Sequence, residues 1–399
     1  MAGCPSRRDF LKSGSIAALA AGLGAAQTGI ALASGGRQPP DQPANAGRSP
    51  GIAAAPEPIR EFRRGGMLYR RLGRTDLFVS VLSFGSHTDP AFKRPGKQGN
   101  VLSEEGQARR DRQLARAFDR GVNMVDTYEN EGQWEPVERL VRPQRDKRLV
   151  SLCRQFPVFV GDNIDQAAKL YGHVDLYRIY VGDGPGVDGQ ILDDWDVMRK
   201  AKAAGKVRAI GISTHSERMM TSALEELEGL DYVMFPYNFI HARADYSEFL
   251  PAAIKKGVGL IAIKPLAAGS IVKLDPRARP GSKPENERIE LYQARNNPLL
   301  PAVVDELTKS LTRLADESLC QAALRFVYSR PFMTCAMPGI FQDHELDDNY
   351  AALSRHLELS RDETAALDAA SRLAELRRGT WLPRRYHWLD ERWQKSDQA

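Results

Sequence analysis

The sequence predicts an α/β protein folded as a single (β/α)8 barrel, the TIM-barrel architecture. Short apolar runs alternate with segments of helical spacing along most of the chain, which is the pattern of a parallel sheet whose strands are connected by helices. Eight such units over this length favour a closed barrel over an open sheet. No Gly-x-Gly-x-x-Gly segment opens a helix, which argues against an open dinucleotide-binding sheet.

The eight predicted strands are short and mostly apolar, as buried parallel strands should be. Each is followed by a helix or by a loop that leads to one. In such a barrel the chemistry lies on the loops after the carboxyl ends of the strands, so site residues are sought there. The strands are expected at residues 77–85, 122–127, 148–154, 174–181, 207–214, 231–238, 258–264 and 333–339.

The predicted helices carry apolar residues at three- and four-residue spacing. In the first, residues 105–121, the apolar positions Leu114, Ala117 and Phe118 share one face, and Gly121 ends the helix. The other helices are expected at residues 163–172, 189–205, 216–229, 246–257, 318–329 and 343–354.

The amino-terminal segment has the features of an export signal. Residues 6–12, SRRDFLK, match the twin-arginine pattern, and an uncharged stretch rich in Ala and Gly follows them. Ala31-Leu32-Ala33 has the small-x-small form that a signal peptidase cleaves. We expect residues 1–33 to be a signal peptide that leaves the protein periplasmic or secreted, with the twin-arginine translocase as its partner during export. The stretch is weakly apolar and lacks a stop-transfer pattern, so no stable membrane anchor is expected.

The rest of the chain is expected to divide into three parts. Residues 34–66 are rich in Gly, Pro, Ala and Arg without an apolar period, which predicts a flexible linker. Residues 67–355 are expected to hold the barrel. Residues 356–399 are expected to form a C-terminal helix and a tail rich in aromatic residues and Arg. Its span 377–394 is expected either to line the substrate pocket or to cover the side of the barrel.

Charge and cysteine content exclude several classes of function. The net charge is +5, part of it in the signal peptide, and no basic run is interleaved with aromatic residues, so a nucleic-acid partner is not expected. Cys4 lies in the expected signal peptide and would be removed with it. The remaining Cys153, Cys320 and Cys335 are odd in number and have neither zinc nor iron–sulfur spacing, so we expect small buried hydrophobic residues.

Several segments of the chain together resemble the aldo/keto reductase family. They are LYRRLGRTDLFVSVLSFGS, AFDRGVNMVDT, VDLYRIY, GKVRAIGIST, PYNF, GVGLIAIKPLAAG and MPGIFQDHELDDN, in that order from Met67 to about Leu353. The resemblance implies a barrel enzyme that reduces carbonyl groups with a nicotinamide cofactor lying across the barrel mouth. It also implies a tetrad of Asp, Tyr, Lys and His that polarises the carbonyl and donates the proton.

Carried over to this sequence, the tetrad is altered. The aspartate position is kept as Asp126, whereas the other three positions hold Glu131 for tyrosine, Arg154 for lysine and Tyr180 for histidine. One hypothesis is a rearranged acid–base set in which Tyr180 donates the proton. The other is a salt bridge from Arg154 to Asp126 or Glu131 in a site without catalysis. Both depend on strand register, because a slip of one residue turns a side chain to the other face.

The resemblance also implies where a dinucleotide would bind. The positions at which the family keeps an amide and a stacking aromatic fall on Met234 and Ile263. Glu345, four residues before the expected adenosine contact Asn349, would repel the 2′-phosphate of NADP, so NAD is favoured over NADP. The expected cofactor-binding residues are Ser213, Thr214, Lys264, Pro265, Leu266, Gly269, Asp348 and Asn349.

Alternatives with different chemistry remain open on the sequence alone. His87 and His215, each just after a strand, could bind a metal with Asp126 and the carboxylates at 129 and 131, although histidines that bond the loop backbone are the simpler interpretation. A metal would favour non-redox acid–base chemistry on a carbohydrate-like ligand. An empty, salt-bridged mouth would favour a catalytically inactive binding protein.

The sequence therefore predicts an exported oxidoreductase of the aldo/keto reductase type. Its expected substrate is a small molecule with a carbonyl group or a sugar-like structure, and its expected cofactor is NAD or NADP, with NAD favoured. This prediction of function depends on the family resemblance, since a fold by itself does not fix a function.

Overall fold

The computed structural model describes residues 61–95, 97, 100–128, 132–155, 158–182, 184–239, 247–269, 309–313 and 317–371. The expected signal peptide, nearly all of the expected linker and the aromatic tail after Ser371 lie outside these residues. So does the candidate catalytic residue Glu131.

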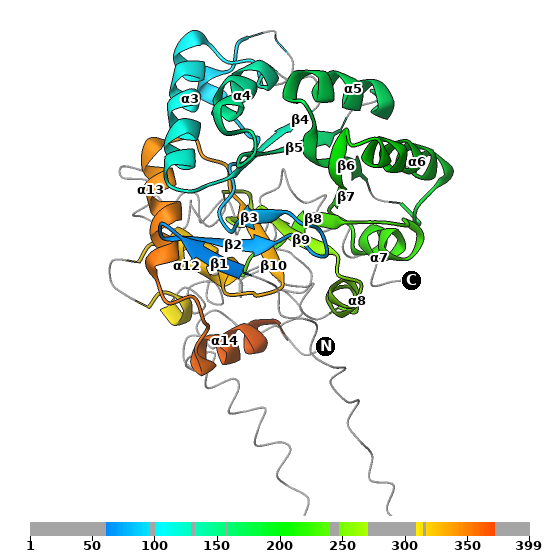
Figure 1. The fold of residues 1–399 in the computed structure, drawn as a ribbon. Helices are drawn as coiled ribbons and strands as arrows, with labels where there is room; N and C mark the ends of the chain where they lie inside the picture. The colour runs from blue at the N-terminus through cyan, green and yellow to red at the C-terminus, as the bar shows by residue number, and fades with distance from the viewer. Residues whose placement is uncertain are drawn as a thin grey trace, which may run out of the picture.

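A curved parallel sheet forms the centre of the molecule (Figure 1). In the described part of the chain it has seven strands in the order β10-β9-β8-β7-β6-β5-β4. Neighbours in sequence are thus neighbours in the sheet, as a (β/α)8 barrel requires. The strands are β4 (Met124–Tyr128), β5 (Leu149–Arg154), β6 (Val174–Val181), β7 (Val207–Thr214), β8 (Tyr232–Pro236), β9 (Gly259–Ile263) and β10 (Met333–Met337).

Residues 81–85 close this sheet into a barrel by bonding to both of its edges. Leu82 forms a parallel bridge with Ala336 of β10, and Phe84 forms one with Val125 of β4. The backbone N–H of Ser83 donates to the Ala336 carbonyl at 3.0 Å, and the N–H of Asp126 donates to the Phe84 carbonyl at 2.9 Å. The predicted eight-stranded barrel is confirmed, with the second half of the segment expected at 77–85 as its first strand.

A small antiparallel sheet precedes the barrel. It consists of β1 (Glu61–Arg64), β2 (Met67–Arg71) and β3 (Phe78–Ser80), coloured blue in Figure 1. Tyr69 Oη donates to the Gly121 carbonyl just before β4, and buried Arg70 donates to the Met333 carbonyl at the start of β10. The sheet therefore covers the amino-terminal end of the barrel, opposite the mouth.

Two expectations for this region are corrected. Residues 61–64 form β1 and do not belong to a linker, and residues 78–80 pair with β2 and not with the barrel. β1 was missed because every one of its residues is exposed, so its sequence, EFRR, lacks the apolar alternation of a strand packed on a core.

Helices surround the sheet in the described residues (Figure 1). Several begin at a Ser or Asp cap, as at Ser103, Asp188, Ser216 and Ser318. No helix in the described ranges is long and apolar enough to cross a membrane. The α-helices are α3 (Glu104–Asp119), α4 (Trp134–Val141), α5 (Val160–Tyr171), α6 (Gly189–Ala203), α7 (Glu217–Glu226), α8 (Phe249–Lys255), α12 (Leu319–Tyr328), α13 (Asp343–Ala351) and α14 (Arg361–Ser371); the short 3-10 turns are η1 (Pro90–Phe92), η2 (Arg142–Gln144), η4 (Ala267–Gly269) and η5 (Ala352–Ser354).

The strands separate two buried clusters, and this separation decides which side chains reach the site. In β5, Leu149 belongs to the cluster inside the barrel, whereas Val150 and Leu152 belong to the larger cluster between sheet and helices. Because side chains alternate along a strand, Ser151 and Cys153 face the barrel interior with Leu149. Cys153, Cys320 and Cys335 are all buried thiols outside any disulfide, as predicted.

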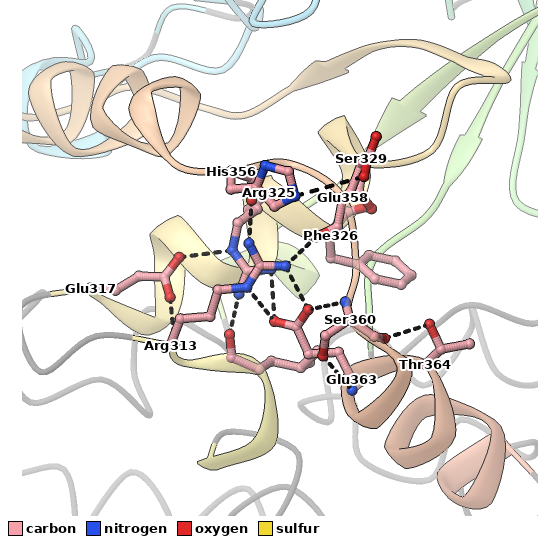
Figure 2. Close-up of polar contacts among 11 residues, drawn as sticks. Arg313, Glu317, Arg325, Phe326, Ser329, His356, Glu358, Ser360, Glu363 and Thr364 are labelled. Atoms are coloured by element: carbon pink, nitrogen blue, oxygen red, sulfur yellow. Dashed lines mark hydrogen bonds and ion pairs between the residues drawn. The ribbon is translucent and has the colours of Figure 1, made fainter.

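The expected C-terminal helix, α14, is joined to α12 by a buried ion network (Figure 2). Arg325 of α12 is fully buried and contacts Glu317 at 2.9 Å and Glu363 at 3.0 Å. Arg313 donates to both carboxylate oxygens of Glu363, at 2.7 and 2.6 Å. Ser360 and Glu363 also cap the start of α14 reciprocally, through backbone N–H donors at 2.7 and 3.1 Å.

Candidate active site

A buried ion pair lies inside the barrel beneath its mouth. Arg178 of β6 donates from Nη1 and Nη2 to the two carboxylate oxygens of Asp126 in β4, at 2.7 and 2.9 Å. Ser151 of β5 donates to Asp126 at 2.7 Å. Burial alone would lower the pKa of Arg178, but the Asp126 carboxylate raises it well above its usual value, so the guanidinium stays charged.

The register of the strands explains how Arg178 reaches Asp126. Tyr128 of β4 is level with Cys153 of β5, which is level with Arg178 of β6. Because the side chain of Cys153 is small, the long side chain of Arg178 can extend across β5 to reach Asp126 on β4. Arg178 is in turn level with Gly211 of β7, where an added Cβ would lie 2.4 Å from a backbone oxygen. This layer of the barrel is therefore closely packed.

Two pairs of tyrosine and histidine lie at the mouth above the ion pair. Tyr128 Oη is 3.4 Å from His87 Nε2, and their rings meet edge to face with centroids 5.9 Å apart. Tyr180 Oη is 3.3 Å from His215 Nδ1, with ring centroids 5.6 Å apart. In each pair the tyrosine lies on one strand and the histidine on the loop after an adjacent strand, so phenol and imidazole groups are presented at two places around the mouth.

Burial and nearby charges shift the pKa values of these groups. His87 keeps an exposed face at the mouth, but desolvation by the surrounding protein and the charge of Lys264 lower its pKa to about 4. Burial, with the charge of Asp126, raises the pKa of Tyr128. Burial lowers the pKa of Lys264 to about 8. At neutral pH the mouth therefore presents a neutral imidazole at His87 and a protonated phenol at Tyr128.

The structure brings together part of the expected catalytic set. Asp126 and Tyr180 both face the inside of the barrel, whereas Arg154 points outward and pairs with Asp194 of α6. The expected contact of Arg154 with Asp126 is not formed, because side chains alternate and Cys153 holds the inward position at the end of β5. The cation beside Asp126 is Arg178, which the sequence reading missed.

A signal for Arg178 was present in the sequence. It interrupts the apolar run VDLYRIYV two residues before Tyr180, so the two share one face of the strand. A charged residue in the middle of a buried strand needs a partner of opposite charge, and Asp126 was the candidate already in view. The sequence contained a similar signal for Tyr128 and His87, since each is a polar residue on the inward side near the end of its strand.

The expected cofactor-binding residues form two groups. Ser213 is nearly buried at the inner end of β7, and the Oγ1 of the next residue, Thr214, accepts a hydrogen bond from the Ser216 N–H in the turn into α7. In the loop after β9, Lys264 and Ala267 adopt left-handed backbone conformations with φ of 52° and 50°. Pro265 is buried, Leu266 is half-buried, and Gly269 ends the described part of the loop with φ of 89°.

The adenosine end is built on α13. Asp348 is engaged within the fold, since its carboxylate accepts from Ser318 Oγ at 2.8 Å and Gln321 Nε2 at 2.6 Å. Asn349 is 2% exposed, and its Nδ2 has no hydrogen-bond partner among the described residues. Glu345 caps α13 by accepting from the Phe341 and Gln342 N–H groups at 2.6 and 3.0 Å. Its carboxylate thus occupies a helix N-terminus that would otherwise attract a phosphate.

A model of the aldo/keto reductase family matches residues 162–372. The chain belongs to the aldo/keto reductase family. The L-glyceraldehyde 3-phosphate reductase of Escherichia coli is 25% identical over 340 residues, covering 77% of this chain and 93% of that protein. An apo aldo-keto reductase of Bacillus halodurans superposes with a TM-score of 0.57 at 19% identity, over 75% of this chain and 95% of that one. One of Klebsiella pneumoniae, solved with NADP and acetate, gives 0.51 at 21% identity, over 75% and 93%.

The residues of this chain fit a dinucleotide at the adenine end, whereas Met234 and Ile263 stand where the family keeps an amide and a stacking aromatic at the nicotinamide end. The buried Nδ2 of Asn349 needs an acceptor, which the edge of an adenine provides. The loop after β9 turns tightly at the left-handed residues Lys264 and Ala267, and Lys264 brings a cationic side chain to the place where the resemblance puts the diphosphate. Ser213, Asn349 and this loop are the residues that would hold the cofactor, whose nicotinamide supplies the hydride in carbonyl reduction.

The metal alternative finds no support in the described residues. His87 and His215 each contact a different tyrosine. No group of three or more His, Cys, Asp and Glu side chains suited to a metal ion occurs in the described ranges, from which residues 129–131 are missing.

Proposed function

We propose that this protein is an exported oxidoreductase that reduces the carbonyl group of a small, sugar-like substrate with NAD(H). The observation that carries the proposal is the Asp126–Arg178 ion pair, which lies beneath the phenol groups of Tyr128 and Tyr180 at the carboxyl ends of the strands. A buried charge pair with hydrogen-bond donors above it can polarise a carbonyl group and stabilise the negative charge that develops on its oxygen.

The choice of NAD over NADP rests on Glu345. Its carboxylate already takes two N–H groups at the start of α13, and its charge would repel the 2′-phosphate of NADP at close range. The Klebsiella pneumoniae relative holds NADP. We expect this chain to differ from that relative at this end of the cofactor.

The substrate class rests on the mouth and on a relative. Phenol and imidazole groups at two places around the mouth can bond hydroxyl and carbonyl oxygens of a polyhydroxylated molecule. The similar Escherichia coli protein is a reductase of L-glyceraldehyde 3-phosphate, a small phosphorylated aldose. Small aldoses are therefore the first substrates to test.

The decisive experiment measures dinucleotide binding and turnover together. Native mass spectrometry of the exported protein would show any bound dinucleotide, and titration with NADH and NADPH would give the two affinities. We expect NADH to bind more tightly and to be oxidised when glyceraldehyde and longer aldoses are added. If the protein binds neither dinucleotide, the proposal is wrong, and a binding protein without catalysis or an enzyme with non-redox chemistry is favoured instead.

Export is part of the proposal and has its own test. The twin-arginine pattern SRRDFLK and the cleavage motif that ends at Ala33 support it. Replacing Arg7 and Arg8 with Lys should keep the protein in the cytoplasm, as followed by cell fractionation, whereas the wild-type protein should reach the periplasm and lose its first 33 residues.

A further inference from the structure

His87 is held in place by a buried arginine behind it. Arg110 of α3 is 4% exposed and donates to the Gly85 carbonyl at 3.0 Å and to the His87 carbonyl at 3.2 Å. Its guanidinium also lies 5.0 Å from the centre of the Phe84 ring. The loop that carries His87 is thus fixed to a helix by charge-assisted hydrogen bonds, which are stronger than neutral ones.

The backbone of Tyr128 is fixed as well, from the neighbouring helix α4. Trp134 of α4 donates from Nε1 to the Tyr128 carbonyl at 2.6 Å, and Trp134 is itself bound through its carbonyl by Tyr171 Oη at 2.9 Å. Both partners of the Tyr128–His87 contact therefore have buried anchors. Groups held in this way are preorganised, so little reorganisation is needed when they act on a substrate.

We infer that Tyr128, oriented by His87, is the residue that donates the proton to the carbonyl oxygen of the substrate. This inference rests on the proposed function. Tyr128 follows Asp126 by two residues on β4, so its phenol lies one inward position above the ion pair, where the charges of both Asp126 and Arg178 act on it. Tyr180 follows Arg178 by two residues on β6, and its phenol contacts His215 on the loop after the next strand. We assign Tyr180 and His215 to binding the rest of the substrate.

The chemistry requires the tautomer of His87 that carries hydrogen on Nε2. Nε2–H then donates to Tyr128 Oη and leaves the phenolic proton for the substrate. The carbonyl carbon receives the hydride, the electron pair of the C=O bond moves to oxygen, and that oxygen takes the Tyr128 proton. The product is an alcohol, and the phenolate keeps the hydrogen bond from His87 until water returns a proton.

The surrounding charges support these protonation states. Asp126, Cys153, Ser86 and Arg178 surround Tyr128, and burial with the Asp126 charge keeps its pKa above the usual value, so the phenol is protonated at neutral pH. Around His87 the charged groups are Lys264, Asp126, Lys93 and Arg110, three of them cations, and its pKa is lowered to about 4. A neutral imidazole can donate from Nε2 without adding a positive charge to the site.

The test compares Tyr128→Phe with Tyr180→Phe in the full-length protein, and each variant is first checked for wild-type folding by circular dichroism. One readout needs no cofactor: binding of D-glycerate, whose carboxylate oxygen stands in for the substrate oxygen, followed by NMR titration. The other is the kcat and KM for glyceraldehyde with NADH. We expect Tyr128→Phe to weaken glycerate binding about tenfold and to lower kcat about a hundredfold or more. Tyr180→Phe should mainly raise KM.

The outcomes separate this inference from the proposed function. Wild-type glycerate binding and kcat in Tyr128→Phe would overturn the inference, as would a loss of both in Tyr180→Phe alone. Glycerate binding that depends on Tyr128, in a protein that oxidises no NADH with any carbonyl, would refute the proposed function and keep the oxygen-binding role of Tyr128. A wild-type protein that reduces glyceraldehyde but binds glycerate independently of Tyr128 would leave the function and remove Tyr128 as the donor.

Discussion

Arg178 and Asp126 form a two-point ion pair inside the barrel, with N–O distances of 2.7 and 2.9 Å and both side chains almost fully buried. The aldo/keto reductase resemblance places a lysine near this aspartate, at the end of the neighbouring strand. Here the cation comes from one strand further along. The charge arrangement can thus be preserved although the residue that supplies the charge has moved.

Removing one member of this pair should be costly. Arg178→Met leaves the Asp126 carboxylate buried without its cation, and we expect a loss of about 3–5 kcal/mol in the free energy of unfolding. The double variant with Asp126→Asn should recover part of that loss. Urea unfolding of the single and double variants measures both effects.

Arg154 provides the matched control. It ends the adjacent strand but points outward to Asp194, and water screens this pair, whose side chains are each 16% exposed, more than the inner pair, so Arg154→Met should cost about 1–2 kcal/mol. Equal losses for Arg178→Met and Arg154→Met would show that the inner pair has no special role in stability.

The sequence predicted the barrel well because the fold depends on repeated features. Short apolar strands and intervening helices recur along the chain, and each repeat adds to the same conclusion. The exposed strand β1 was missed for the opposite reason, since its residues Glu61–Arg64 carry no pattern that burial would impose.

The site was predicted less well because it depends on which face of a strand each single residue occupies. Cys153 and Arg154 are neighbours at a strand end, and nothing local in SLCR decides which of them faces inward. The pairing of β5 with β4 and β6 decides it, by placing Cys153 level with Tyr128 and Arg178. Partners such as Arg110, which binds the loop of His87, are even harder to predict from the sequence, because they come from a helix that contacts the loop only in the folded chain.

Glu345 should control the preference between the two dinucleotides. Glu345→Gln keeps an oxygen that can accept the capping hydrogen bonds but removes the charge that repels a 2′-phosphate. We expect NADPH to bind about tenfold more tightly to this variant, with NADH affinity nearly unchanged. Titration of wild type and variant with both dinucleotides measures the ratio.

Glu345→Ala is the control for the cap itself. It should lower the free energy of unfolding by about 1 kcal/mol through loss of the capping box. If Glu345→Gln leaves the ratio of NADPH to NADH affinity as in wild type, the carboxylate does not set the preference.

His87 should make stability fall in mildly acidic solution. Its pKa is about 6.5 in an unfolded chain and about 4 in the folded protein, so between these values the unfolded chain binds more protons. This contribution to stability is complete above about pH 6.5 and is lost as the pH falls towards 4. The exposed face of the ring is screened by water, which limits the effect to about 1 kcal/mol.

Unfolding at pH 7 and pH 5 tests this expectation. His87→Asn should show a smaller loss of stability between the two pH values than wild type, whereas His356→Asn, at an exposed histidine far from the mouth, should behave as wild type. Lys264→Met should raise the pKa of His87 in an NMR titration, because it removes a nearby positive charge. An unchanged pKa would show that Lys264 does not act on this ring.

Glu363 should be the residue on which the docking of α14 depends most. Burial would raise its pKa, but the hydrogen bonds from Arg313 and the Ser360 N–H, with the charge of Arg325, lower it. Glu363→Gln retains an oxygen for the Ser360 cap but leaves Arg325, which is fully buried, with one carboxylate fewer. We expect a loss of about 3 kcal/mol in the free energy of unfolding, larger than the roughly 1 kcal/mol expected for Ser360→Ala, which removes only the cap hydroxyl.

Hydrogen exchange distinguishes a local effect of Glu363→Gln from a global one. The ion network joins α14 to α12 and to the segment around Arg313, so its loss should raise exchange first in α14 and leave the barrel strands protected (Figure 2). Asp196→Asn, which breaks an exposed ion pair on α6, should change neither stability nor exchange measurably. If Ser360→Ala releases α14 as much as Glu363→Gln does, the cap and not the buried charges holds the helix in place.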